Sequence, residues 1–122
     1  MHSNKAIAAA RRKLVGTWRS DRARSMENWV FPKRIAAKKL RFFESIFGNS
    51  TWRFTLTSCS STFKKLKFKE RYKIIWANED SAVVVFTAKG KEICHHLFFE
   101  GKHFYMSIGR AGNAEYFKKL RA

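Results

Sequence analysis

The feature that most constrains this chain is a change in its hydrophobic period after Gly48. Before this glycine, apolar residues recur at helical spacing, whereas after it they alternate with polar ones, as in Trp52, Phe54 and Leu56. Alternation places one face of a strand against a core and the other face in water. Three further segments continue as strands: 62–68, 70–76 and 83–86. Turns are predicted between strands at 78–80 and 89–90, where turn-forming residues gather.

A hairpin is predicted over residues 92–108, because Glu100-Gly101 forms a two-residue connection between two β-rich runs. In the register set by this turn, Phe99 faces Lys102 and Leu97 faces Phe104. One face of the hairpin is then apolar and holds Ile93, His95, Leu97, Phe99, Phe104, Met106 and Ile108. The other face holds Glu92, Cys94, His96, Phe98, His103, Tyr105 and Ser107. A loop over 109–113 and a closing strand over 114–120 complete the prediction.

Two helices are predicted in the first half of the chain. Residues 4–15 carry Ile7, Ala10 and Leu14 at helical spacing, and a short strand is expected after them over 16–21, with Asp21 able to cap the next element. The second helix spans about 32–47, between Pro32 and a stop at Gly48-Asn49. Its apolar arc includes Phe43 and Phe47, through which we expect it to pack against the sheet.

The predicted fold class is mainly β (α+β), a small antiparallel meander barrel of seven to eight strands. The 122 residues suit a single domain, in which 1–15 form a basic N-terminal helix and 16–122 form the barrel with its inserted helix. Closure of the meander would remove exposed strand edges. No apolar run approaches the roughly 20 residues of a membrane-spanning helix, so no transmembrane segment is predicted.

A cytoplasmic location is predicted from two features of the sequence. The apolar stretch near the N-terminus is short and runs directly into Arg11, Arg12 and Lys13, unlike a secretory leader. Cys59 and Cys94 lack CxxC spacing and suit free thiols in a reducing compartment.

Three short motifs resemble a known family of barrels. Gly16-Thr17-Trp18, followed by an antiparallel meander, resembles the lipocalin-like (calycin) barrels, in which an early Gly-x-Trp closes the barrel floor. Residues 16–21, 99–101 and 115–120 resemble small uncharacterised bacterial lipocalin-like proteins, and the likeness spans roughly residues 14–121. The resemblance implies a cavity for a small apolar or amphipathic molecule. It also implies that Trp18 is buried near one end of the barrel, with a cation from Lys118, Lys119 or Arg121 over its ring.

The charge of the chain is its most unusual property. Lys and Arg number 26 against 9 Asp and Glu, which gives a formal net charge of +17. A surface of this charge attracts polyanions. Two clusters could contact nucleic acid or an acidic partner: Arg34, Lys38 and Arg41 on the second helix, and Lys65, Lys67 and Lys69 on a strand. No RNP motif, KH loop or zinc-finger spacing accompanies them, so sequence-specific readout is not predicted.

Candidate chemical groups are few. Cys94, His96 and His103 share a predicted face and could bind zinc, but the two histidines are diagonal and no further ligand beyond Glu92 is evident, so no metal and no cofactor are predicted. No phosphate-binding loop or Gly-x-Ser-x-Gly elbow is present. If the barrel is hollow, Glu92, His96 and Tyr105 could orient a ligand; if it is solid, they are surface residues.

Three functional hypotheses remain open. The first is a non-enzymatic protein that binds a small apolar or amphipathic ligand in a barrel cavity. The alternative is a protein that binds nucleic acid or another acidic partner through its basic exterior. A weak enzyme or metal protein is the third, and the sequence predicts neither a catalytic residue nor an oligomeric state.

Overall fold

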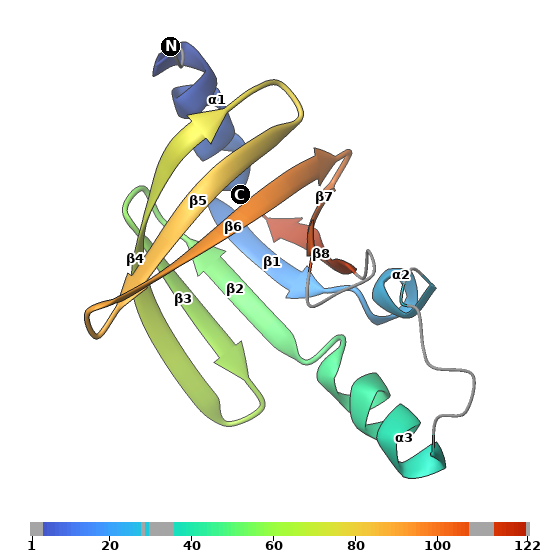
Figure 1. The fold of residues 1–122 in the computed structure, drawn as a ribbon. Helices are drawn as coiled ribbons and strands as arrows, with labels where there is room; N and C mark the ends of the chain where they lie inside the picture. The colour runs from blue at the N-terminus through green and yellow to red at the C-terminus, as the bar shows by residue number, and fades with distance from the viewer. Residues whose placement is uncertain (1–3, 28, 30–35, 108–113, 122) are drawn as a thin grey trace.

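The computed structural model, which describes residues 4–27, 29, 36–107 and 114–121, is a closed antiparallel barrel (Figure 1). Each strand is hydrogen-bonded to the next along the chain, and β8 pairs with β1 to close the barrel. The predicted meander barrel is therefore confirmed. The elements are α1 (Asn4–Leu14), β1 (Gly16–Ser20), α2 (Arg22–Glu27), α3 (Ala37–Ile46), β2 (Ser50–Phe54), β3 (Ser58–Phe63), β4 (Leu66–Ala77), β5 (Ser81–Ala88), β6 (Lys91–Glu100), β7 (His103–Ser107) and β8 (Ala114–Arg121).

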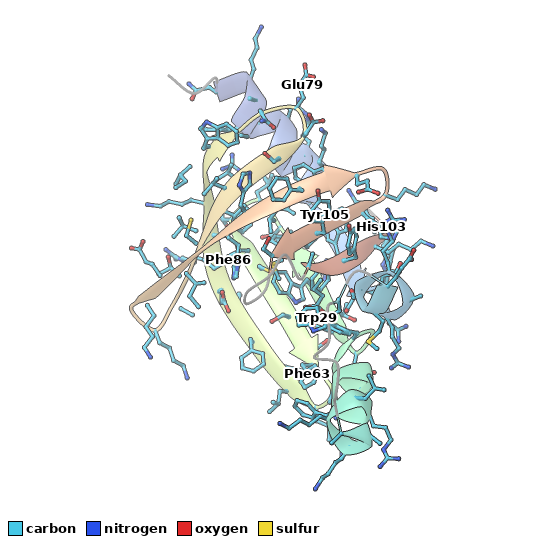
Figure 2. The ribbon with its side chains drawn as sticks, turned by 45° about the vertical axis from the view of Figure 1, so that its right-hand side comes forward. Trp29, Phe63, Glu79, Phe86, His103 and Tyr105 are labelled. Carbon is cyan, nitrogen blue, oxygen red and sulfur yellow. The ribbon has the colours of Figure 1, made fainter. Side chains whose placement is uncertain are left out.

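One end of the barrel is closed by α1. Ala10 and Leu14 of this helix belong to the buried core, and the helix packs on β4 and β5. Lys13 holds it to the β4–β5 turn, because its Nζ donates a hydrogen bond to the Glu79 carbonyl at 2.7 Å. We call this the closed end; the opposite end, which carries the β3–β4 and β5–β6 turns, is the open end. Figure 2 shows Glu79 beside α1 at the closed end and Phe63 at the other end of the barrel.

The core is built from the inward-facing aromatic residues of the strands. Phe54, Phe104 and Phe117 are almost fully buried, and the rings of Phe104 and Phe117 stack with centroids 4.9 Å apart. Trp18 meets Phe104 edge to face at 4.7 Å. Because Phe54 of β2 also meets Phe104 of β7 at 6.3 Å, and these strands are not neighbours, the packing depends on closure rather than on any one hairpin.

The strands around residue 60 differ from the prediction. Strand β2 ends at Phe54, and Leu56 lies in a turn with 67% of its surface exposed instead of continuing the buried face. The Thr55 side chain stabilises that turn, since its Oγ1 accepts a hydrogen bond from the Ser58 amide at 3.0 Å. Segment 62–68, expected as one strand, is split by a turn at Lys64 and Lys65, where Lys64 has a φ of 55°. A non-glycine residue seldom takes this backbone conformation, which is why the turn has no signal in the sequence.

The β6–β7 hairpin forms with a register shifted by two residues. Phe99 pairs with Phe104 and Leu97 with Met106, so the turn residues are Gly101 and Lys102. The physical reason is that Gly101, with a φ of 58°, takes the first central position of the turn, which favours glycine. A shift of two residues preserves the pleat, so Leu97, Phe104 and Met106 still face inward as predicted. Ile93 also belongs to this face but is 54% exposed at the open end, and Ile108 lies outside the described residues.

The connection between β1 and β2 contains two helices rather than one. The predicted cap is present, because Asp21 Oδ1 accepts a hydrogen bond from the Arg24 amide at 3.1 Å at the start of α2. The predicted helix over 32–47 is described as α3 from Ala37, and residues 32–35 lie outside the described part. α3 extends away from the barrel instead of packing against the sheet (Figure 1).

The attachment of α3 is confined to its C-terminal end. Phe47, just after the helix, is buried against the Trp29 ring, whereas Phe42 within the helix is 61% exposed. The side chain of Phe43 lies outside the described residues. The apolar arc of the helix therefore did not predict its packing, because α3 joins β2 at the open end and runs outward from there.

A candidate ligand cavity in the barrel

A cavity of about 160 Å³ lies between the inward faces of six consecutive strands. Its lining residues are Trp52, Cys59, Ser61, Glu70, Phe86, Ile93, His95 and Met106. The larger hollows described, of about 370 to 510 Å³, are more open to solvent than this cavity. The cavity is the one hollow described whose lining comes from inward positions all around β2 to β7, which makes it the candidate ligand site.

The cavity exists because β3 presents small side chains to the interior. Cys59 and Ser61 point inward from β3, whereas β2 and β5 present the large rings of Trp52 and Phe86. Those two rings contact each other with centroids 5.9 Å apart. The space left by the small residues compares with an engineered apolar cavity of about 150 Å³ that holds benzene in another protein. A small aromatic molecule of one ring or two fused rings is thus the size of ligand that fits.

Three polar side chains enter this mostly apolar space. Ser61, Glu70 and His95 are each half-buried at its wall. Burial lowers the pKa of His95, and the nearby Glu70 carboxylate opposes that effect without reversing it. The imidazole is therefore neutral at pH 7 and offers one hydrogen-bond donor and one acceptor.

The cavity thiol is held in its protonated form. Burial, with a further contribution from the charge of Glu70, raises the pKa of Cys59 to about 12. The thiolate is the nucleophilic form of cysteine, and it is scarce at pH 7 for a group with this pKa. Cys59 therefore lines the cavity as a thiol, in a form that is a poor nucleophile.

The residues that the sequence suggested as ligand-orienting lie on the outer face of the barrel. Glu92 and His96 are exposed, and Tyr105 is half-buried between neighbouring rings. His96 Nε2 is 2.9 Å from Ser81 Oγ, and its ring stacks on Phe98 at 4.2 Å. None of the three lines the cavity.

Sequence reasoning missed Glu70 and His95 as cavity residues. A signal was present for His95, because the predicted hairpin placed it on the apolar, inward face. For Glu70 the sign was its position between Phe68 and Tyr72 in an alternating strand, but the surrounding lysines drew attention to the outer face. Because basic residues flank Glu70 in the sequence, its inward position on β4 was not predicted.

The candidate zinc ligands are occupied by other partners. His103 Nε2 lies 2.9 Å from Asp21 Oδ2, while His96 contacts Ser81. Although partial burial opposes it, hydrogen bonds from His103 and from the Arg24 amide lower the pKa of Asp21. Among the described residues, no group of three or more His, Cys, Asp or Glu side chains is arranged to hold a metal ion.

The predicted basic residues divide between two surfaces. Lys67 and Lys69 are exposed on the outer face of β4, while Lys65 lies in the preceding turn rather than on the strand. Lys38 and Arg41 are exposed on α3, and Arg34 lies outside the described residues. The structure brings together the strand lysines but leaves the helical cations as a separate group.

Trp18 occupies the position that the resemblance implied. Its ring is 2% exposed near the closed end, and Lys119 Nζ lies 5.3 Å from the ring centroid. The indole Nε1 donates a hydrogen bond to the Leu14 carbonyl at 2.8 Å, which ties β1 to the end of α1. The predicted burial and the predicted cation are both confirmed.

Comparison with protein-family models, with curated proteins and with solved structures found no match. Within the described residues, no helix has the length and apolar character needed to cross a bilayer. The assignment of a function therefore depends on the geometry of this chain alone.

Proposed function

We propose that this protein is a non-enzymatic, lipocalin-like binding protein that holds a small apolar or amphipathic molecule in the barrel cavity. The observation that carries the proposal is the lining of the 160 Å³ space by inward residues of six strands. An apolar pocket with a few convergent polar groups is the usual form of a small-molecule site. Because both cysteines are free thiols, we keep the cytoplasm as the expected location.

The polar groups define the chemical class of the ligand. The Glu70 carboxylate and the neutral His95 imidazole both accept hydrogen bonds at the cavity wall. A small aromatic ligand with an N–H or O–H donor satisfies them, whereas the Glu70 carboxylate would repel a ligand that carries a carboxylate. Trp52 and Phe86 supply aromatic surface for the ring. Indole and phenol are therefore suitable probes, with benzene as the apolar reference.

Isothermal titration calorimetry with indole tests the proposal. Ser61→Phe should abolish indole binding, because its ring would fill the cavity from β3. Ser60→Phe is the matched control: it adds the same ring one residue away on the exposed outer face of the strand, and it should bind like the wild type. Thermal melting establishes that both variants are folded. Equal indole affinity in both variants, or no heat with indole, phenol and benzene for the wild type, would overturn the proposal.

A second candidate function is polyanion binding through the outer face of β4. Lys67, Lys69, Arg71 and Lys73 are all exposed there. Their cross-strand partners are neutral: Thr62, Ser60, Ser58, Thr87 and Val85. Four contacts to duplex DNA would give a log–log salt slope of about −4. Affinity for duplex DNA and single-stranded RNA as salt is raised tests this candidate, and an absence of binding at low salt refutes it.

A further inference from the structure

The open end of the barrel carries a set of exposed apolar side chains. Leu66 and Phe68 on β4 are 58% and 51% exposed, and Ile93 on β6 is 54% exposed. All three belong to the inward-facing register of their strands, but they lie beyond the packed core, and Ile93 also lines the cavity. We call these three residues the rim. Apolar surface left at a barrel mouth, beside polar residues, is typical of an interaction site.

Cations surround the rim on two turns. Lys64 and Lys65 form the β3–β4 turn, and Lys89 and Lys91 flank Gly90 at the β5–β6 turn; all four are exposed. Lys64 Nζ also lies 5.6 Å from the centroid of the Phe63 ring. The described acidic residues nearby are Glu70, which faces the cavity, and Glu92, exposed on the outer face of β6. The open end thus combines the apolar side chains of the rim with positively charged turns.

We propose that the open end docks on the surface of an anionic lipid bilayer, with the rim entering the acyl boundary and the turn lysines contacting lipid phosphates. This inference goes beyond both candidate functions, because it uses the rim and the turn lysines rather than the outer face of β4. Exposed apolar residues next to basic residues match the two attractions that hold a protein at such a surface, apolar burial and charge. In this orientation the cavity mouth faces the bilayer, where an amphipathic ligand would concentrate.

A nucleic acid fits the open end less well than a bilayer. Single-stranded nucleic acid binds through bases stacked on several open aromatic faces, whereas the rim offers one aromatic ring, Phe68, beside the aliphatic Leu66 and Ile93. The aromatic rings on the outer face are already engaged with one another, since Phe98 stacks on both His96 and Tyr105. A phosphate backbone would pair with the lysines but would leave the rim exposed to water.

Vesicle flotation tests this proposal with four variants. The vesicles are phosphatidylcholine with and without phosphatidylglycerol. Lys64→Gln/Lys65→Gln should weaken binding to the anionic vesicles by about 30-fold, given the usual contribution of a lysine at an anionic surface. Leu66→Ser/Phe68→Ser should weaken it by about tenfold or more through lost apolar burial.

The matched controls lie at the closed end. Leu56→Ser changes an apolar residue that is 67% exposed, and Lys102→Gln changes an exposed turn lysine, so neither should alter vesicle binding.

Phe68→Trp provides a second measurement that needs no destabilising change. Brominated lipid should quench the emission of the introduced indole beyond the wild-type signal, because residue 68 is 51% exposed on the rim, whereas the four native tryptophans are buried or half-buried.

The outcomes separate this proposal from the two candidate functions. Binding to anionic vesicles that the rim and turn variants lose, but the closed-end variants keep, supports bilayer docking. Equal losses in all four variants, binding to neutral vesicles alone, or no bromolipid quenching overturns it. Binding to DNA or RNA without vesicle binding also overturns it, while polyanion binding would stand. Indole binding in the cavity is unaffected by any of these results.

Discussion

The replacement of Trp18 by alanine is the sharpest test of how this barrel is held together. The ring is 2% exposed and meets Phe104 edge to face at 4.7 Å. Its Nε1 donates to the Leu14 carbonyl at 2.8 Å, and Lys119 lies over its face. Truncation of a core tryptophan costs about 3–5 kcal/mol of unfolding free energy, most of it from lost apolar burial and the cavity left behind.

Two of the lost interactions have separate magnitudes. The aromatic pair and the indole hydrogen bond contribute about 1 kcal/mol each. Trp18→Phe retains a ring but removes the hydrogen-bond donor, so it should cost about 1–3 kcal/mol and leave the Leu14 carbonyl without this partner. The difference between the two variants then measures the contribution of the ring itself.

Urea unfolding and thermal melting measure these costs. For a chain of this size, the alanine variant should melt about 12–20 °C below the wild type. Leu120→Ala is the control, because this side chain is 55% exposed on the same end of the barrel and should change stability by less than about 0.5 kcal/mol. Hydrogen exchange should show lost protection in α1. A cost below about 1 kcal/mol for Trp18→Ala would refute the argument that this ring joins α1 to the core.

Two further predictions concern buried titratable groups. Burial raises the pKa of Glu115, although a hydrogen bond from Ser20 opposes the shift. The protonated group therefore contributes its full stability below its pKa in the unfolded chain, and this stability is lost as pH rises through its pKa in the folded protein. Glu115→Gln should therefore raise Tm at about pH 7 but not at about pH 4, and an equal change at both would sink the idea. Mass spectrometry after maleimide treatment should find Cys94 modified and Cys59 unmodified until denaturant is added; two adducts on the native protein would show that the burial of Cys59 is wrong.

Local pattern was sufficient for the faces of the strands and for the barrel. Alternation assigned Leu97, Phe104 and Met106 to the interior, and all three are buried. This works because successive side chains on a strand point to opposite sides, whatever the strand pairs with. Trp18 was also predictable, since it follows Gly16 in a short motif that resembles a known barrel floor.

The register of the β6–β7 hairpin and the cavity in the barrel were decided by the tertiary structure. Turns at 100–101 and 101–102 leave the same residues inward, so only closure of the barrel and the positive φ of Gly101 select the observed register. The cavity depends on small Cys59 and Ser61 meeting large rings from other strands, which no local pattern records. The direction of α3 is likewise set by where β1 and β2 pair, because an amphipathic pattern identifies an apolar face without saying what will cover it.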